Sequence, residues 1–236
     1  PLAHTITGEF WLDSKPDDLH WNVSDSGWAK AAYSTLFGPW NMGAAVFVHD
    51  SRGKYDPQQT LHLLKKYDIS TLCAPPTAFR LLVQEDLSGH QFPALRHCVS
   101  AGEPLNPEVI EGWAERTGLT IYDGYGQTET VLLVGNYRCM DVRPGSMGKP
   151  TPGFRMGIVD HEGVEVEPGQ EGDIAVRVKP ERPLGMFSEY WKNPEETSDS
   201  FLGDWYITGD RGMVDEEGYF WFVGRADDVI ISAGYR

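Results

Sequence analysis

The stretch DGYGQTE at residues 123–129 carries the strongest indication of the fold. It follows a short apolar run and sets the flat side chain of Tyr125 between two glycines, which permit a close approach to the backbone. Thr128 offers a hydroxyl group to a phosphate oxygen, and Glu129 offers a carboxylate to Mg²⁺. A glycine–aromatic–glycine loop on its own is more often a turn than a nucleotide site. The whole seven-residue pattern directly after a strand is much more specific.

Upstream of residue 123, short apolar runs alternate with amphipathic helical patterns. Helices are expected from Pro57, which follows the capping residue Asp56, over residues 77–85, and from Pro107 to Gly118. This alternation predicts an α/β fold with a layered, mostly parallel sheet and flanking helices. The runs expected to form its strands are residues 44–49, 69–74, 95–100 and 119–122.

Two of these expected strands are followed by unusual loops. In parallel sheets, ligands bind beyond the carboxyl ends of the strands. The sequence AGEPL follows residue 100, and DGYGQTE follows residue 122. The rule therefore directs attention to both loops, although Gly102, Glu103 and Pro104 by themselves form simply a turn that leads into a helix.

The character of the chain changes after about residue 136. Helical periodicity fades, glycine and proline become frequent, and short strands are separated by turns. This pattern predicts a small antiparallel β-barrel-like subdomain attached to the α/β unit. Its expected strands are residues 154–159, 172–178, 205–208 and 219–223.

The composition argues against several classes of protein. The 236 residues include 35 acidic and 20 basic side chains, for a net charge of −15, and form no Lys/Arg cluster that could follow a nucleic-acid backbone. No window approaches eighteen consecutive apolar residues, so no membrane span is expected. Three cysteines without CxxC spacing and seven histidines without metal-ligand spacing favour buried thiols, a reducing compartment and no structural metal. Because the chain begins at Pro1, we expect it to be a segment of a longer protein.

Two further features have both a functional and an ordinary interpretation. Asp210, in the sequence WYITGDRG, can accept both hydroxyl groups of a ribose, but an isolated Asp in such a turn more often bonds its own backbone. Arg225 and Arg236 each lie beside a glycine-containing turn and suit bidentate contact with phosphate. In an acidic protein, however, a lone arginine is usually part of a surface ion pair.

The order of the motifs changes this balance. GEP, YGQTE, GSMGKP at residues 145–150, TGD and GRADD…GYR follow one another along the chain. This series resembles the adenylate-forming superfamily of acyl-CoA synthetases, luciferases and peptide-synthetase adenylation domains, and the resemblance covers essentially the entire chain. Stretches such as GPWNMGAAVFVH, GYGQTET and GRADDVIISAGYR are most similar to the medium-chain acyl-CoA synthetases.

The resemblance implies the large N-terminal domain of an ATP-dependent ligase. In the implied reaction, a carboxylate attacks the α-phosphate of MgATP to give an acyl-adenylate and pyrophosphate, and coenzyme A then displaces AMP to give a thioester. An incomplete α/β subdomain is expected at residues 1–135, a β-rich subdomain at 136–226, and a hinge with the start of a C-terminal domain at 227–236. A phosphate loop is expected before Pro1 and the rest of the C-terminal domain after Arg236, so residues 1–236 alone are expected to be inactive.

The family's functional residues carry over to matching positions of this chain. Catalytic roles are implied for Thr128, Glu129 as the Mg²⁺ ligand, Arg225 and Arg236. Asp227 is implied as the hinge, and the coenzyme A path is implied at Ala233, Gly234 and Tyr235. Binding of ATP or AMP, with Tyr125 against the base and Asp210 at the ribose, is implied for Gly102, Glu103, Pro104, Asp123, Gly124, Tyr125, Gly126, Gln127, Thr128, Asp210 and Arg225.

An acyl pocket is implied at Trp28, Ala29, Ala101 and Gly126. Acetate-specific members of the superfamily carry a bulky tryptophan in place of Gly126, so the glycine implies room for a medium-chain or aromatic acid. Lys30, next to this region, has no clear role in the pocket.

The implied partners are a carboxylic acid, ATP and coenzyme A, without nucleic acid or a membrane span. The implied location is the cytoplasm, or the mitochondrial matrix in a eukaryote. Two alternatives stay open: another adenylating enzyme, such as an aryl-CoA ligase or a peptide-synthetase adenylation domain, and a non-catalytic nucleotide-binding relative. Intact Thr128, Glu129, Asp210 and Arg225 count against the non-catalytic alternative.

Overall fold

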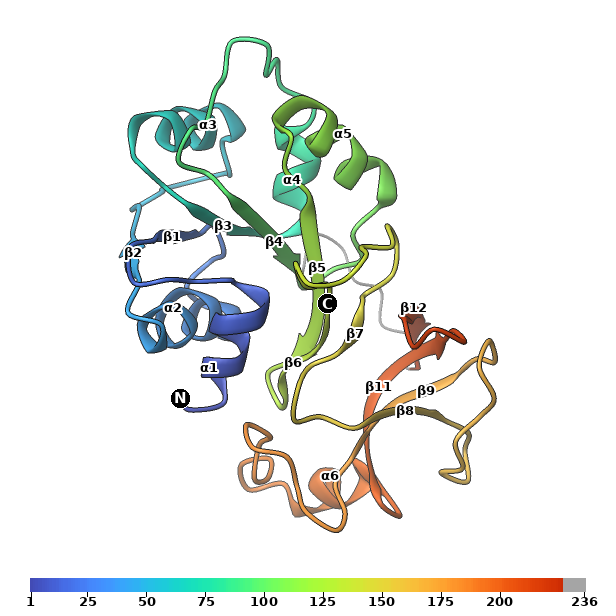
Figure 1. The fold of residues 1–236 in the computed structure, drawn as a ribbon. Coiled ribbons are helices and arrows are strands. Elements are labelled where there is room, and N and C mark those ends of the chain that lie inside the picture. Colours follow the sequence, from blue (N-terminus) through green and yellow to red (C-terminus); the bar gives the residue numbers. More distant parts are fainter. Residues whose placement is uncertain (227–236) are drawn as a thin grey trace.

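The computed structural model describes residues 1–226, which form two β-sheets with most of the helices around the larger one (Figure 1). The larger sheet has seven strands in the order β2-β1-β3-β4-β5-β6-β7. Neighbours from β2 to β5 run parallel, and β6 and β7 are antiparallel additions at one edge. The strands are β1 (Leu19–Asn22), β2 (Ala45–Phe47), β3 (Thr71–Ala74), β4 (His97–Ala101), β5 (Ile121–Gln127), β6 (Val131–Gly135) and β7 (Lys149–Pro150).

Both faces of the parallel part are covered, because successive side chains of a strand point to opposite sides of the sheet. Leu72 of β3 packs in one apolar cluster with Phe79 and Trp113, whereas Cys73, the next residue, packs in another with Trp11. The helices of the first face are α3 (Pro57–Lys66), α4 (Pro76–Leu82) and α5 (Pro107–Thr117). The remaining helical segments, which pack against β1, β2 and one another, are α1 (His4–Ile6), η1 (Thr7–Trp11), η2 (Ala31–Phe37) and α2 (Gly38–Asn41).

The smaller sheet is antiparallel, with the strand order β10-β11-β9-β8 and β12 paired to β11. One apolar cluster joins it to the larger sheet, because Val134 of β6 packs in the same cluster as Ile158 and Val176. The architecture expected from the sequence is therefore confirmed. The elements of this half are β8 (Met156–Val159), β9 (Gly172–Arg177), α6 (Pro194–Asp199), β10 (Phe201–Leu202), β11 (Trp205–Val214) and β12 (Phe220–Arg225).

The ends of two helices follow the signals in the sequence. The Asp56 carboxylate accepts hydrogen bonds from the backbone N–H groups of Gln58 and Gln59 and so caps α3. Gly118 has a φ of +73° and ends α5, because glycine adopts the left-handed region without a steric penalty. Both expectations are confirmed.

The extents of two strands differ from the expectation. DGYGQTE is not a loop that follows a strand, because β5 continues through Gln127 and pairs there with β6. The Thr-Gly-Asp segment does not end a strand either, because β11 continues to Val214 with a register shift between Ile207 and Arg211. In both places a neighbouring strand provides main-chain hydrogen bonds. A glycine-rich sequence does not by itself indicate that such a partner strand is present.

Three strands of the larger sheet, β1, β6 and β7, have no counterpart among the expected elements. β1 lies between β2 and β3 and pairs in parallel with both, although its sequence LHWN has no clear strand pattern. β7 pairs with β6, so Lys149 and Pro150 still belong to the larger sheet. The division into subdomains at residue 135 stays a prediction.

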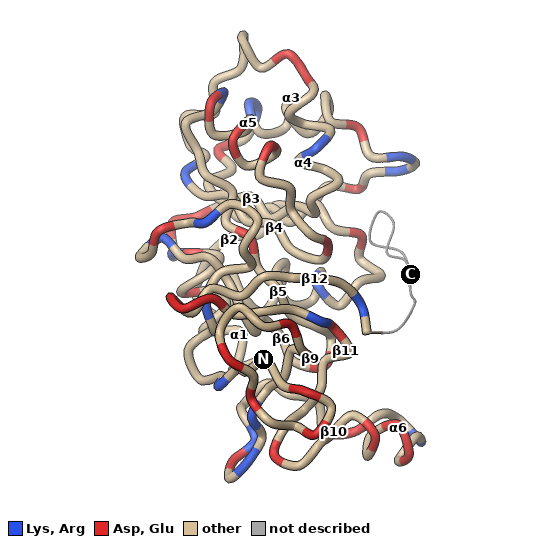
Figure 2. The backbone as a smooth tube through the Cα atoms, turned by 90° about the vertical axis from the view of Figure 1, so that its right-hand side faces the viewer, with Lys and Arg blue, Asp and Glu red and all other residues tan. Residues whose placement is uncertain are grey.

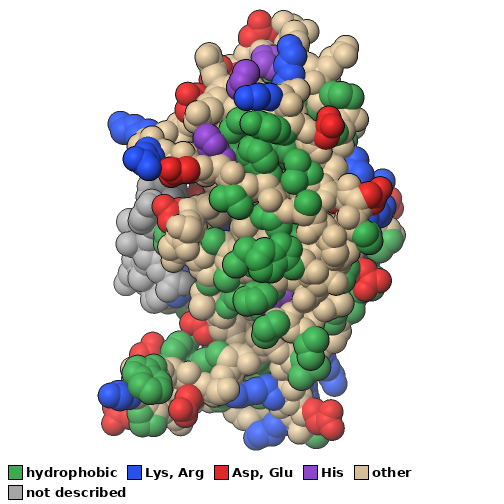
Figure 3. Space-filling model, turned by 90° about the vertical axis from the view of Figure 1, so that its left-hand side faces the viewer, with side chains coloured by type: hydrophobic (Ala, Val, Ile, Leu, Met, Phe, Trp, Pro, Cys, Tyr) green, Lys and Arg blue, Asp and Glu red, His purple; other side chains and the backbone are tan. Residues whose placement is uncertain are grey.

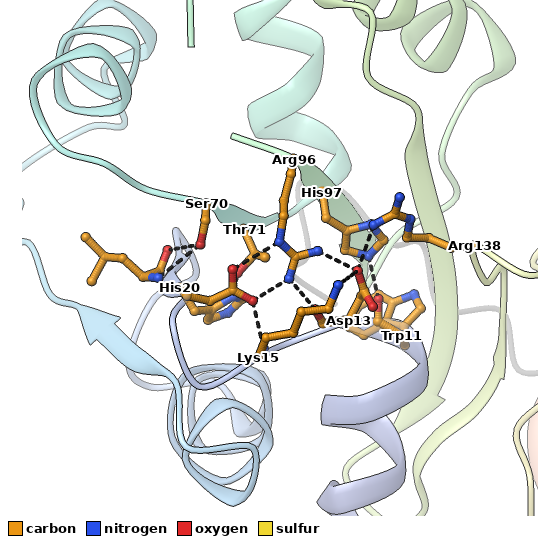
Figure 4. Close-up of polar contacts among 11 residues, drawn as sticks. Trp11, Asp13, Lys15, His20, Ser70, Thr71, Arg96, His97 and Arg138 are labelled. Carbon is orange, nitrogen blue, oxygen red and sulfur yellow. Dashed lines mark hydrogen bonds and ion pairs between the residues drawn. The ribbon is translucent and has the colours of Figure 1, made fainter. Parts of the chain in front are cut away.

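An ion-pair network ties the N-terminal segment to β4 (Figure 4). The Arg96 guanidinium lies between two carboxylates, contacting Asp13 Oδ2 at 2.5 Å through Nη1 and Asp18 Oδ1 at 3.0 Å through Nε. Arg138 Nη1 donates a second hydrogen bond to Asp13 Oδ2, at 2.9 Å. Burial raises the pKa of Asp13, but the hydrogen bonds from Arg138 and Arg96 outweigh it and hold that pKa below its ordinary value.

The surface of the described residues is mixed in charge and apolar in places. Acidic and basic residues are interspersed along the backbone (Figure 2). Hydrophobic side chains gather on the face of the molecule that carries the edge strand β2 (Figure 3). Within residues 1–226, no helix has both the length and the apolar character needed to cross a bilayer.

Candidate active site

The two segments singled out from the sequence lie side by side at the carboxyl edge of the parallel strands. β4 and β5 are parallel neighbours, with Ala101 in register with Gly124. Gly102, which follows β4, has a φ of +106°, a conformation that favours glycine. The general rule for ligand binding in parallel sheets therefore points to a real juxtaposition of the GEP and DGYGQTE segments.

Asp210 is the centre of a polar cluster that joins the two sheets. Its Oδ2 accepts hydrogen bonds from the Tyr125 hydroxyl at 2.5 Å and from Gln127 Nε2 at 2.9 Å. Its Oδ1 accepts a hydrogen bond from Arg225 Nη1 at 2.8 Å, and these two side chains are only 7% and 12% exposed. Tyr206 extends the cluster, donating from its hydroxyl to Gln127 Oε1 at 3.1 Å. Five residues from three strands thus converge at one point.

The cluster fixes the protonation and the free acceptor positions of Tyr125 and Asp210, both predicted to contact a nucleotide. Burial, together with the neighbouring Asp210, raises the pKa of Tyr125. Its hydroxyl group therefore stays protonated and donates a hydrogen bond to the carboxylate. Each carboxylate oxygen offers about two acceptor positions. Oδ1 can therefore accept a ribose hydroxyl group while it keeps its contact with Arg225.

Thr128 and Glu129 lie in the turn that links β5 to β6. The Tyr33 hydroxyl donates to the Thr128 carbonyl oxygen at 2.8 Å. The Glu129 carbonyl oxygen accepts from the Phe187 N–H at 2.7 Å, and its Oε1 accepts from the Tyr190 hydroxyl at 3.1 Å. Side chains from both halves of the chain thus hold this turn.

The Glu129 carboxylate fits a Mg²⁺ ion that is shared with phosphates. Mg²⁺ is usually bound by one or two carboxylates together with substrate phosphate and water. Glu129 is half-buried, its polar partner is the neutral Tyr190 hydroxyl, and the neighbouring Thr128 is exposed. Among residues 1–226, no group of three or more His, Cys, Asp or Glu side chains has the arrangement of a metal site, so a Mg²⁺ ion here would depend on the nucleotide.

Two residues of the predicted nucleotide site have carboxylates that are engaged inside the protein. Asp123 is buried, its Oδ1 accepts the Gly124 N–H at 2.9 Å, and burial raises the pKa of this carboxyl group well above its ordinary value. Glu103 contacts the Thr77 hydroxyl at 2.9 Å and Arg80 Nη2 at 3.0 Å. These two side chains hold neighbouring segments in place. In the loop of Glu103, the exposed Gly102 and Pro104 are the parts open to a ligand.

The residues of the predicted acyl pocket lie in different surroundings. Trp28 is 44% exposed, Ala29 is half-buried, and the Ala101 carbonyl oxygen accepts a hydrogen bond from Lys30 Nζ at 2.6 Å. A Cβ atom added to Gly126 would lie 1.9 Å from the Val131 carbonyl oxygen. The glycine is therefore required by the close approach of β6, which is a reason for its presence besides pocket volume.

A profile of the AMP-binding enzyme family matches residues 2–191. The chain belongs to the AMP-binding enzyme family. The chain is 54% identical over 235 residues to the mitochondrial acyl-coenzyme A synthetase ACSM3 of Rattus norvegicus, and 51% identical to the mitochondrial acyl-coenzyme A synthetase ACSM4 of Homo sapiens. Each alignment covers 100% of the chain but 40% of the relative, so the chain spans about two fifths of the length of these curated relatives.

Solved structures show the same fold. The anthranilate CoA ligase AuaEII, in complex with anthranoyl-AMP, matches with a TM-score of 0.86 and 31% identity over 99% of this chain and 44% of its own. The acyl-CoA synthetase of Brucella canis matches with a TM-score of 0.84 and 35% identity over 100% of this chain and 43% of its own. The fold of this AMP-binding enzyme is thus the one expected from its motifs.

Several residues that shape the site of this AMP-binding enzyme escape motif reasoning. Tyr33, Tyr190 and Tyr206 hold the motif residues in place from distant parts of the chain, and Lys30 contacts the end of β4. No local pattern distinguishes these side chains from ordinary core or surface residues. The predicted hinge at Asp227, the coenzyme A residues Ala233, Gly234 and Tyr235, and Arg236 lie outside the described residues.

Proposed function

We propose that the chain is part of an ATP-dependent acyl-CoA synthetase. The enzyme forms an acyl-adenylate from a carboxylic acid and MgATP, and coenzyme A then displaces AMP to give a thioester. The cluster of Tyr125, Gln127 and Arg225 around Asp210, beside the carboxyl ends of β4 and β5, is the observation that carries this proposal. The names of the relatives, and the anthranoyl-AMP bound to AuaEII, support it.

In the proposed site, different residues contact different parts of the nucleotide. Tyr125 and the Gly102–Pro104 loop border the base, and Asp210 with Arg225 binds the ribose. Thr128 contacts phosphate, and Glu129 holds the Mg²⁺ ion, which offsets phosphate charge when it is bound. The Tyr190 hydroxyl orients the carboxylate of Glu129 for that purpose.

The proposed acid is a medium-chain or aromatic carboxylic acid, held beside Trp28, Ala29, Ala101 and Gly126. The half-exposed Trp28 offers a broad apolar surface for such a chain. The proposed second step uses residues beyond 226, with Asp227 as the hinge, Ala233 to Tyr235 on the coenzyme A path and Arg236 near the α-phosphate or the acyl group. Because the relatives ACSM3 and ACSM4 are named as mitochondrial, we place the enzyme in the mitochondrial matrix.

Calorimetric titration of the chain tests this function. The ligands are MgATP and hexanoyl-sulfamoyl-adenosine, a stable acyl-adenylate mimic without the β- and γ-phosphates. Both are expected to bind the wild-type chain. Glu129→Gln is expected to weaken MgATP binding about tenfold, because it removes a Mg²⁺ ligand, while binding of the mimic changes little.

Glu181→Gln, at an exposed position outside the site, is the matched control and should bind both ligands as the wild type does. A wild-type chain that binds neither ligand would contradict the proposal. In the complete protein, transfer of the acyl group to a carrier protein and not to coenzyme A would favour the peptide-synthetase alternative.

A further inference from the structure

Lys30 lies at the carboxyl edge of the parallel sheet, where ligands of such folds bind. Its Nζ donates to the Ala101 carbonyl oxygen at the end of β4, at 2.6 Å. Its backbone carbonyl accepts from Asn22 Nδ2 at the end of β1, at 3.3 Å. The ammonium group thus reaches from the segment before η2 to the carboxyl end of β4.

Lys30 is half-buried, and two acidic side chains lie near its ammonium group. Burial lowers the pKa of Lys30 below its ordinary value, although the nearby Glu103 and Asp123 oppose that shift. Neither carboxylate is hydrogen-bonded to Nζ within residues 1–226, because Glu103 is engaged by Thr77 and Arg80, and Asp123 by the Gly124 N–H.

The Lys30 ammonium group has more N–H donors than acceptors among the described residues. A lysine ammonium group carries three N–H donors. Among the described residues, the single acceptor of Nζ is the Ala101 carbonyl oxygen. Buried polar groups are usually satisfied, so a half-buried ammonium group with one protein acceptor has donors left for an oxygen atom of a ligand.

The position of Lys30 indicates which part of a ligand it meets. Tyr33, three residues further along, contacts Thr128 in the turn proposed to bind phosphate. Lys30 instead lies near Asp123, towards the start of β5, and the four residue-to-residue steps from Asp123 to Gln127 span roughly 13 Å of strand. An acid whose carboxylate lies at the Thr128 turn therefore meets Lys30 with the distal part of its chain.

We propose that the Lys30 ammonium group donates a hydrogen bond to an oxygen atom on the chain of the substrate acid. The site then favours acids with an oxo or hydroxyl group far from the carboxylate over plain alkanoic acids. This assignment rests on the proposed acyl-CoA synthetase function and specifies its substrate class. It makes Lys30 a specificity-determining residue of the same site.

Two stable acyl-adenylate mimics test the assignment on the chain itself. Hexanoyl-sulfamoyl-adenosine and 5-oxohexanoyl-sulfamoyl-adenosine differ in one chain oxygen, and their binding is measured by calorimetry. We expect the oxo compound to bind the wild type about tenfold more tightly, because a hydrogen bond to a charged donor is formed. Lys30→Met is expected to abolish that preference, with little change in the binding of the hexanoyl compound.

Two further variants complete the experiment. Lys54→Met, at an exposed position, is the control and should keep the wild-type preference. Lys30→Arg keeps the charge and is expected to keep much of the preference, whereas Lys30→Gln is expected to lose most of it. This pair carries the test if circular dichroism shows that Lys30→Met does not fold.

The possible outcomes distinguish the proposed role of Lys30 from the proposed acyl-CoA synthetase function. Equal weakening of both mimics by Lys30→Met would overturn the assignment, because it would mean that Lys30 contacts the carboxylate end or only supports the fold. An unchanged preference would overturn it as well. Failure of both mimics to bind the wild type would instead contradict the proposed function, and the assignment with it.

Discussion

At the scale of single residues, Asp210 connects more of the molecule than any motif reading suggests. Its carboxylate accepts hydrogen bonds from Tyr125 and Gln127 of β5 and from Arg225 of β12. A side chain expected to bind ribose is therefore also the partner of a nearly buried guanidinium group. Its removal affects the folded state before any ligand is present.

We expect Asp210→Ala to lower the free energy of unfolding by about 3 kcal/mol, because loss of one partner leaves a buried charge poorly compensated. Urea denaturation of the chain measures this change. Asp204→Ala removes the carboxylate from a more exposed pair with Arg177 and should cost less than about 1 kcal/mol. Equal effects of the two substitutions would show that the Asp210 cluster does not stabilise the fold.

At the scale of elements, the hairpin of β5 and β6 carries most of the nucleotide motif. The register of the two strands shifts between Tyr125 and Gly126, and Val131, which begins β6, has a φ of +60°. A β-branched residue is strained in this region, and such strain is found at sites where the backbone is held for function. The tight approach of Val131 to Gly126 makes the glycine a requirement of the hairpin.

We expect Gly126→Ala to destabilise the chain by about 2 kcal/mol or more, because the added methyl group would overlap the Val131 carbonyl group. Gly89→Ala is the matched control, since a Cβ at that exposed position meets no atom within 4 Å. Denaturation of both variants in urea measures the difference. If Gly126→Ala were as stable as Gly89→Ala, pocket volume would be the better explanation for the glycine.

At the scale of the whole molecule, buried histidines couple stability to pH. Burial lowers the pKa of both His20 and His97 to about 4. In an unfolded chain the pKa of histidine is about 6.5, so below that pH the unfolded state binds more protons than the folded state. The contribution of these residues is therefore fully present above about pH 6.5 and is lost as the pH falls towards about 4.

We expect the free energy of unfolding to fall between pH 7 and pH 5 by about 2 kcal/mol for each of these two histidines. Urea denaturation at both pH values measures the fall. His97→Gln, which keeps a donor for the Trp11 carbonyl oxygen, should make the fall smaller by about 2 kcal/mol. His161→Gln, at an exposed position, should leave it unchanged, and a free energy that does not vary with pH would contradict the coupling.

The sequence alone determined the fold class and the members of the nucleotide motif. Caps, glycines and alternating apolar patterns act over a few residues. Asp56 therefore marks the start of α3, and Gly118 marks the end of α5, as expected. The series of motifs predicted the family, because the order of motifs along a chain can be read from one sequence. The apparent loop at DGYGQTE was wrong for the same local reason: its glycines hide a strand that needs β6 as a partner.

Only the tertiary structure decided which side chains meet. The Tyr125 hydroxyl reaches Asp210 across 85 residues of sequence, and Lys30 reaches Ala101 across 71. No local pattern encodes such contacts, because they depend on strand order and register. DGYGQTE therefore predicted a nucleotide site, while the packing of the two sheets brought Asp210 to Tyr125 and Lys30 to the end of β4.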